Sequence, residues 1–323
     1  MRFNKLDLNL LVVLDALLST RSVSRAAEKV FLSQPATSLS LSRLRSYFED
    51  ELLVSVGKTQ VLTPLAAELI KPVRDVLLQI QTVTRARPSF DPATSSRRFV
   101  IESSDYVISV LLSEVVRRVA EVAPMMQFDL RAINTLTHQH LDGGEIELLI
   151  TPEFSTVEGH PSEPLFEDTF SCLMWRGHRL AKAELTVEDY LDAGHVGVEW
   201  IGGRRVTYDA QLLTAARQAR RQEIIAPNFT LVPQLLEGTQ RIATLPTRLA
   251  TAMSERFDVV VLPCPLQIPG FTELLQWHKH HERDPGLVWL RSILKETAVS
   301  LAARQWPSPE NGKVSDKRSR RKR

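Results

Sequence analysis

Four polar side chains recur at helical spacing in one short segment of this 323-residue sequence. They stand 4, 4 and 3 residues apart and therefore share one face of a helix: Gln34, Ser38, Ser42 and Arg45. An amide such as that of Gln34 can form two hydrogen bonds with the edge of an adenine, and short polar side chains fit the major groove of DNA. The spacing predicts a helix face that hydrogen-bonds to base edges.

Long cationic side chains accompany this face and predict contacts with phosphate groups. They belong to Arg43, Arg45 and Lys58. Leu39 is an exception on a groove-facing surface, although an apolar side chain can contact a thymine methyl group. The alternative is an ordinary amphipathic helix whose Ser and Arg side chains are solvated. The pattern alone does not decide between these two interpretations.

A second set of polar residues follows predicted strands further along the chain. Ser103 and Ser104 come after the strand predicted at residues 98–102, and Thr151 comes after the strand predicted at residues 147–150. Ligands of open α/β sheets bind at the carboxyl ends of the strands. These hydroxyl groups are therefore candidates for bonding a small molecule. Ser104 can equally well serve only as the cap of the following helix.

The sequence has few motifs that would indicate an enzyme or a metal site. The histidines of the His278-Lys279-His280-His281 segment are spaced i, i+2, i+3, which brings metal ligands together poorly on a helix or a strand. Gly202-Gly203-Arg204-Arg205 is interpreted as a turn, and the HExxH, GxSxG and full GxxxxGK[ST] motifs do not occur. We predict that the chain is not an enzyme and has neither a metal site nor a cofactor.

Three predicted helices and a hairpin position the first polar face. Leucines recur at helical spacing from Leu10 to Leu18, and Ser22 caps a second helix over residues 23–30. Ser33 caps the third helix, where Pro35 lies in the first turn and its missing N–H is harmless. Strand-like segments at residues 52–56 and 60–62 then form a hairpin. This order of elements is that of a winged helix-turn-helix.

The remaining chain has the pattern of a helix followed by an α/β body. Thr63-Pro64 opens a long helix whose apolar residues repeat like a coiled-coil seam, with a kink expected at Pro72. Residues 85–96 are rich in proline and small polar residues and predict a domain boundary. Strands and helices then alternate, including a helix at residues 211–219, which indicates a parallel or mixed sheet. Residues 308–323 are predicted to be disordered.

Charge and cysteine content indicate where the chain works. The net charge is +4 over residues 1–90, −7 over residues 91–307 and +5 over residues 308–323, so the first part suits a polyanionic partner. The basic tail could add phosphate attraction or only solubility. Two isolated cysteines, a poor secretory signal and the lack of a membrane-spanning run predict a cytoplasmic protein without a membrane partner.

Several motifs together resemble the LysR-type transcriptional regulators over nearly the whole chain to about Gln305. They are Arg25-Ala26-Ala27, Leu32-Ser33-Gln34-Pro35-Ala36-Thr37-Ser38, Arg43-Leu44-Arg45 and Leu62-Thr63-Pro64. The resemblance implies that DNA is contacted by Ser33, Gln34, Pro35, Thr37, Ser38, Ser42, Arg43, Arg45 and Lys58. Three further segments are similar to the branch with regulators of nodulation and of naphthalene, salicylate or chlorinated-aromatic breakdown: residues 6–11, Pro227-Asn228-Phe229-Thr230 and residues 238–246.

The family implies a domain plan that composition could not supply. Residues 1–62 would form the winged helix-turn-helix, residues 63–91 a dimerisation helix and hinge, and residues 92–307 an effector-binding domain. That domain would be a periplasmic-binding-protein-like pair of α/β subdomains, with residues 92–166 plus 268–307 in the first and 167–267 in the second. The family also implies a homodimer or homotetramer on dyad-symmetric double-stranded DNA, with RNA polymerase as a partner.

The resemblance also implies an effector between the two subdomains. His178, Asn228, Phe229 and Thr239 would join Ser103, Ser104 and Thr151 around it, with Phe229 stacking on an aromatic molecule. Some relatives that respond to aromatic compounds have His where Asn228 stands, which leaves the effector open. We expect an activator that controls aromatic-compound catabolism; the alternative is a nodulation-type activator that responds to flavonoids. A solute-binding module would explain the body but not the helix-turn-helix.

Overall fold

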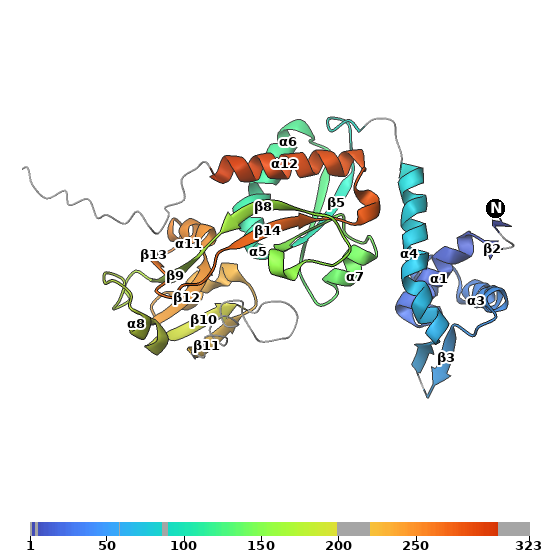
Figure 1. Ribbon diagram of the computed structural model, residues 1–323, viewed down its shortest axis with the longest axis horizontal. Coiled ribbons are helices and arrows are strands. Elements are labelled where there is room, and N and C mark those ends of the chain that lie inside the picture. Colours follow the sequence, from blue (N-terminus) through green and yellow to red (C-terminus); the bar gives the residue numbers. More distant parts are fainter. Residues whose placement is uncertain (1, 4–5, 58, 86–89, 199–219, 303–323) are drawn as a thin grey trace, which may run out of the picture. The chain divides into compact units, whose positions relative to one another are not determined.

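The computed structural model describes residues 2–3, 6–57, 59–85, 90–198 and 220–302. Lys58, the helix predicted at residues 211–219 and the tail at residues 308–323 lie outside the described residues. Residue contacts divide the chain into two units, the first mainly from residues 1–89 and the second mainly from residue 90 onward (Figure 1). None of the described helices is long and apolar enough to cross a membrane.

The first unit contains helices around a small hairpin. Its elements are β1 (Arg2–Phe3), β2 (Leu6–Asp7), α1 (Asn9–Thr20), α2 (Val23–Lys29), α3 (Gln34–Phe48), β3 (Leu53–Val56), β4 (Thr59–Leu62) and α4 (Pro64–Arg85). The predicted caps are present: the Ser22 hydroxyl accepts from the Arg25 N–H at 3.4 Å, and the Ser33 hydroxyl accepts from the Ala36 N–H at 3.3 Å. Strands β3 and β4 pair antiparallel. The predicted winged helix-turn-helix is therefore confirmed.

Apolar residues at helical spacing bury one side of each helix in this unit. Leu14 and Leu17 of α1 pack in one core with Leu41 and Leu44 of α3. The small side chain of Ala26 is completely buried and lets α2 pack closely against its neighbours. This packing leaves the opposite side of α3 in solvent.

The second unit begins with a five-stranded mixed sheet, which we call subdomain I. Its strands lie in the order β6-β5-β7-β14-β8, with β5 and β7 parallel and β14 antiparallel to its neighbours. Helices α6 and α12 lie side by side against one face of this sheet (Figure 1). The elements are β5 (Arg98–Ser103), α5 (Asp105–Val107), η1 (Ile108–Leu112), α6 (Ser113–Val122), β6 (Gln127–Ala132), α7 (Thr137–Asp142), β7 (Leu148–Pro152), η2 (Glu153–Ser155), β8 (Ser162–Asp168), β14 (Phe271–Gln276), η4 (Lys279–His281) and α12 (Pro285–Ala302).

A second five-stranded sheet, subdomain II, is inserted between β8 and β14. Its strands lie in the order β11-β10-β12-β9-β13, with β9 antiparallel to β12 and β13. The elements are β9 (Phe170–Trp175), α8 (Val187–Asp192), β10 (Gly194–Val198), β11 (Arg221–Ala226), η3 (Phe229–Leu231), α10 (Val232–Leu236), β12 (Arg241–Pro246), α11 (Thr247–Ser254) and β13 (Val259–Pro263). The predicted pair of α/β subdomains is confirmed.

Two crossovers join the subdomains. Strand β8 continues through Asp168, which pairs with Phe271, so the first crossover falls at Thr169, two residues after the predicted boundary. The second crossover lies between β13 and β14. In each sheet, the strand ends next to these crossovers form one boundary of the sheet. We call this boundary the hinge edge.

Candidate DNA-binding surface and effector site

Helix α3 has a buried face and an exposed face, as the sequence predicted. Gln34, Pro35, Ser38, Ser42 and Arg43 are exposed. Ser33 is exposed as well, although its hydroxyl is engaged as the helix cap. The exposed residues are spaced so that they lie along one side of α3. Hydrogen-bonding groups along one side of a helix can meet base edges in a major groove.

Thr37 differs from its predicted role as a DNA contact. Its side chain is completely buried, and its hydroxyl donates to the Ser33 carbonyl oxygen at 3.1 Å. Because Leu41 and Leu44 follow it at spacings of 4 and 3, Thr37 belongs to the buried face. In this structure Thr37 packs in the core below α3, and its hydroxyl does not point to a DNA groove.

Arg45 also has a different environment from the predicted one. Its Nε donates to the Glu51 carbonyl oxygen at 2.8 Å, and its Nη2 donates to the Leu53 carbonyl oxygen at 2.9 Å. Its Nε also lies 3.1 Å from a carboxylate oxygen of Glu51. The guanidinium group therefore joins the end of α3 to the start of the wing.

A second polar connection, which sequence reasoning missed, ties the wing to α4. The Asp50 carboxylate accepts from the Leu52 N–H and from the Thr63 hydroxyl, both at 2.6 Å. The Thr63 hydroxyl in turn accepts from the Ala66 N–H at 3.1 Å and caps α4. The Thr63-Pro64 pair indicated the cap, but no local signal in the sequence pointed to Asp50, 13 residues earlier.

The hinge edges bring five of the seven predicted effector residues to one region of the second unit. Strands β5 and β7 are parallel and end at Ser103 and Pro152, so Ser103, Ser104 and Thr151 lie at the hinge edge of subdomain I. Strand β11 ends at Ala226, beside Val198 at the end of β10, so Asn228 and Phe229 lie at the hinge edge of subdomain II.

The two serines of this region have different environments. The Ser103 hydroxyl is completely buried and has no hydrogen-bond partner among the residues that the structure describes, so it is available to a ligand or to an ordered water. The Ser104 hydroxyl accepts from the Val107 N–H at 3.3 Å and caps α5. The capping alternative therefore describes Ser104 in this structure.

Thr151 is buried, and strand alternation separates it from Ser103. Successive side chains of a strand point to opposite faces. Ile101 and Ile150 pack in the main core, whereas Leu149 belongs to a separate cluster on the other face. Ser103 therefore shares the face of Ile101, and Thr151 shares the face of Leu149.

The segments around Ser104 and Phe229 contact each other across the hinge. The Thr230 N–H donates to the Asp105 carboxylate at 2.8 Å, and the rings of Tyr106 and Phe229 meet edge to face with centroids 6.2 Å apart. Asn228 caps the short helix η3 by accepting from the Leu231 N–H at 3.2 Å. Aromatic and polar groups from both subdomains thus meet at this edge.

A buried acidic cluster, also missed from the sequence, lies beside these rings. The Tyr106 hydroxyl donates to the Asp168 carboxylate at 2.6 Å, and burial raises the pKa values of both groups. The Glu273 carboxyl group is buried, and neither of its oxygens is hydrogen-bonded to a described residue. Burial, followed by the charge of Asp168, raises the pKa of Glu273 to about 8. At neutral pH Glu273 is therefore mostly protonated, with both a donor and acceptors.

His178 and Thr239 do not lie with the other predicted effector residues. Strand β9 starts at the hinge and runs antiparallel to β12, so that Phe170 pairs with Pro246 and Met174 pairs with Ile242. Residues that follow β9 or precede β12 therefore lie at the far edge of subdomain II. There the Arg179 N–H donates to the Gln240 side chain at 3.0 Å. The structure thus corrects the expectation of one shared site, because the direction of β9 was not evident from the sequence.

The His178 ring has a local structural environment at that far edge. Its Nδ1 accepts from the Leu180 N–H at 3.0 Å, and burial lowers the pKa of the imidazole. The Thr239 hydroxyl donates to the Leu236 carbonyl oxygen at 2.8 Å. Both side chains stabilise turns next to β9 and β12.

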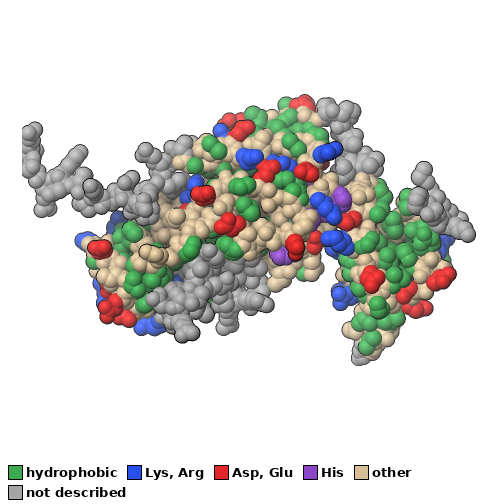
Figure 2. Space-filling model, in the orientation of Figure 1, with side chains coloured by type: hydrophobic (Ala, Val, Ile, Leu, Met, Phe, Trp, Pro, Cys, Tyr) green, Lys and Arg blue, Asp and Glu red, His purple; other side chains and the backbone are tan. Residues whose placement is uncertain are grey.

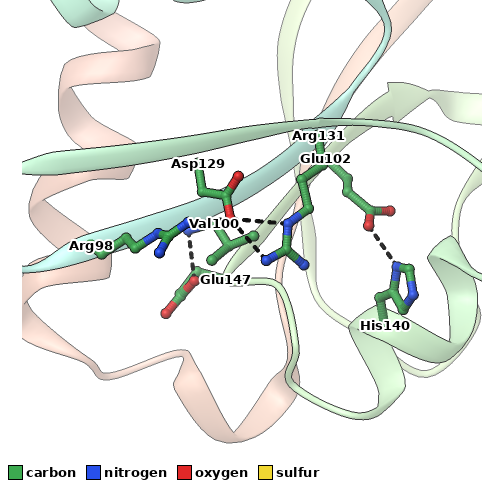
Figure 3. A network of polar contacts seen from close by, with 7 residues as sticks. All are labelled: Arg98, Val100, Glu102, Asp129, Arg131, His140 and Glu147. Atoms are coloured by element: carbon green, nitrogen blue, oxygen red, sulfur yellow. Dashed lines mark hydrogen bonds and ion pairs between the residues drawn. The ribbon is translucent and has the colours of Figure 1, made fainter.

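A polar network crosses the other face of subdomain I. The Glu102 carboxylate is fully buried and lies 2.6 Å from Nδ1 of His140 on α7 (Figure 3). Beside it, the Asp129 carboxylate accepts from Arg98 at 2.7 Å and from Arg131 at 2.8 Å. The hydrogen bond from Arg131 lowers the pKa of Asp129. This network fixes β5, β6 and α7 to one another and so supports the strand that carries Ser103.

Two family models match separate parts of the chain. The model for a bacterial regulatory helix-turn-helix protein of the lysR family matches residues 8–67, and the model for the LysR substrate binding domain matches residues 92–299. The second match alone covers more than half of the sequence. Both families are regulatory rather than enzymatic, in agreement with the sequence expectation.

Individual proteins give the same assignment. The chain is 40% identical to nodulation protein D of Bradyrhizobium sp. (strain ANU 289) over 312 residues, 96% of this chain and 92% of that one. It is 40% identical to nodulation protein D 3 of Mesorhizobium japonicum over 301 residues, 93% of this chain and 100% of that one. These relatives do not support the expected role in aromatic catabolism, and they favour the nodulation-type alternative.

Solved structures agree on the fold. A probable transcriptional regulator of Pseudomonas aeruginosa superposes with a TM-score of 0.62 at 27% identity, covering 91% of this chain and 98% of that one. Full-length OxyR of the same organism superposes with a TM-score of 0.68 over 91% of this chain and 94% of that one. At 18% identity, the OxyR likeness is evidence for the fold only.

Proposed function

This chain belongs to the LysR family of bacterial transcriptional regulators, and on that premise we propose that it is a regulator of the nodulation-protein-D type. In this proposal it activates transcription from dyad-symmetric DNA when it binds a small aromatic inducer of the flavonoid class. The observation that carries the proposal is the 40% identity to nodulation protein D over almost the full length of both chains.

The DNA-binding half of the proposal rests on the exposed face of α3. Gln34 would bond a base edge, and Ser38 and Ser42 would lie along the same groove. Arg43 is exposed and supplies a phosphate contact, and Lys58 keeps that role on sequence grounds. Arg45 would act indirectly, because its hydrogen bonds hold the wing against α3.

Two copies of the chain would pair through helix α4. Val76 and Ile80 are both exposed and stand four residues apart on this helix, so they form an apolar pair that a second α4 can cover. Pairing of two copies would present two α3 helices to the two halves of a dyad-symmetric site. An activator bound there would contact RNA polymerase.

The inducer half rests on the hinge edge. Ser103 has a buried hydroxyl group without a partner among the described residues, and next to it the half-buried ring of Phe229 packs on the buried ring of Tyr106 from the other subdomain. An aromatic molecule with hydroxyl groups matches such a mixture of rings and polar anchors. A ligand that contacts both subdomains would also couple its binding to their relative arrangement.

The DNA-binding proposal is tested by selecting duplexes from a random pool with the full-length chain. We expect enrichment of one sequence whose two halves are related by a dyad, hereafter the selected duplex. Gln34→Ala should weaken binding to it by about 1–3 kcal/mol, because a bidentate base contact is lost. Thr37→Ser, at the buried position next to the reading face, is the matched control and should bind with wild-type specificity. Failure to enrich any sequence would overturn the proposal.

A further inference from the structure

Two large apolar side chains stand in solvent at the helix-turn-helix. Phe31, in the turn between α2 and α3, is 95% exposed, and Leu39, on α3, is 57% exposed. Hydrophobic side chains also reach the surface elsewhere on this unit (Figure 2), so exposure alone assigns no role. Backbone conformation and position distinguish these two residues.

Phe31 has a left-handed backbone conformation, with φ at +56°. That conformation is unfavourable for a side chain with a Cβ, and Asn or Gly tolerates it better than an aromatic residue. Among the described residues, Arg21, Glu49 and Leu52 are the other non-glycine residues with positive φ. Arg21 and Glu49 are C-caps of helices, and Phe31 likewise ends a helix, because it follows the C-cap Val30 of α2 and the next N–H, of Leu32, donates to the Ala27 carbonyl oxygen at 3.0 Å.

Leu52 is the instructive comparison for Phe31. Its side chain is 1% exposed and packs in the core of the unit, so burial accounts for an apolar residue in a strained conformation. Phe31 has the same backbone conformation without burial. The end of α2 accounts for the backbone conformation, but not for an aromatic side chain in solvent at a position that Gly or Asn usually occupies, and this is a reason to look for a function of the side chain.

Leu39 lies in the middle of the exposed face of α3. It follows Ser38 directly and stands four residues after Pro35 and three before Ser42, all of which are exposed. Residues at these spacings are neighbours on a helix surface. The apolar groups that base edges offer in a major groove are the methyl groups of thymine, which apolar side chains can contact.

We propose that Leu39 and Phe31 are apolar DNA contacts, with Leu39 packed on a thymine methyl group and Phe31 packed on the sugar of a neighbouring nucleotide. This inference rests on the proposed function, because it requires α3 to enter a major groove. Contacts with bases carry sequence information, whereas contacts with sugars and phosphates position the protein. Leu39 would therefore contribute specificity, and Phe31 would contribute affinity.

The Leu39 contact is tested by replacing the thymines of the selected duplex with deoxyuridine, one position at a time in both halves. Removing one methyl contact should weaken wild-type binding about fourfold per half-site, the equivalent of roughly 0.8 kcal/mol. Leu39→Ala should bind the original duplex more weakly and lose this sensitivity to deoxyuridine. Val12→Ala, at a 48% exposed apolar position of α1, is the matched control and should keep it.

The outcomes separate the inference from the proposed function. Wild-type protein that selects a duplex and then shows no deoxyuridine-sensitive position would overturn the role of Leu39 and leave sequence-specific binding intact. Equal sensitivity of wild type and Leu39→Ala would overturn it as well. A wild-type chain that selects no duplex at all would overturn the proposed function, and the inference with it.

Phe31→Asn tests the second contact without risking the fold. Asn tolerates the left-handed conformation, so the melting temperature should stay equal to that of wild type or rise. Affinity should fall severalfold for the selected duplex and for unrelated duplexes alike, because a sugar contact is independent of sequence. Unchanged affinity for both kinds of duplex would overturn the role of Phe31, and a loss confined to the selected duplex would overturn its assignment to the sugar.

Discussion

Replacing Glu273 by Gln should change the pH dependence of stability of the second unit. Burial and the charge of Asp168 raise the pKa of Glu273 from its ordinary value of 4.5 to about 8. The folded state therefore holds a proton that the unfolded state releases above pH 4.5, and this proton stabilises the fold most fully at low pH. The stabilisation is lost as the pH rises toward and through 8.

The magnitude follows from the two pKa values. Linkage gives a loss of roughly 3–4 kcal/mol between pH 5 and pH 8, since each pKa unit corresponds to about 1.4 kcal/mol. Gln cannot ionise, so the Glu273→Gln variant should not lose this stability between pH 5 and pH 8. The free energy of unfolding of the variant, relative to wild type, should therefore increase by that amount between pH 5 and pH 8.

The assay is denaturant unfolding of the full-length chain at several pH values, followed by tryptophan fluorescence. All five tryptophans lie after residue 90, so the signal reports on the second unit. Glu167→Gln, an exposed carboxyl side chain on the neighbouring strand β8, is the matched control. A difference between Glu273→Gln and wild type that does not vary with pH would refute the assignment of a raised pKa to Glu273.

Other substitutions test the first unit. Ser33→Ala should cost about 1 kcal/mol of stability because α3 loses its cap, as measured by thermal unfolding. Arg45→Ala should cost about 1–2 kcal/mol and weaken DNA binding through the wing. Arg45→Lys should not restore either property, because one ammonium group cannot reproduce both backbone contacts. Wild-type stability of Arg45→Ala would show that these hydrogen bonds contribute nothing beyond the Asp50 connection of the wing.

Local patterns in the sequence predicted the first unit well. The caps at Ser22 and Ser33 and the exposed side of α3 follow from interactions within a few residues, and the structure has them. Arg45 could not be placed in this way. Its partners are backbone carbonyls six and eight residues away, across a turn whose conformation the sequence did not define.

The candidate effector site was harder to predict because it depends on topology. The hinge edge collects Ser103 and Asn228 from strands that lie far apart in the chain and in different sheets, whereas the sequence predicted only that strands and helices alternate in a parallel or mixed sheet. His178 was misplaced because β9 runs antiparallel to its neighbours. Nothing in the sequence marked Glu273 as a buried residue. A carboxyl group in a strand is ordinarily solvated, and the burial of Glu273 arises from packing in the folded unit.

Transcription from a promoter that carries the selected duplex, measured with the full-length chain and RNA polymerase, tests the central claim most directly. We predict that a flavone raises transcription, that salicylate and a chlorinated phenol do not, and that Gln34→Ala abolishes the response. Activation by salicylate or the chlorinated phenol with no response to flavonoids would contradict assignment to the nodulation type. Transcription that is independent of both the selected duplex and Gln34 would contradict the DNA-binding mechanism itself.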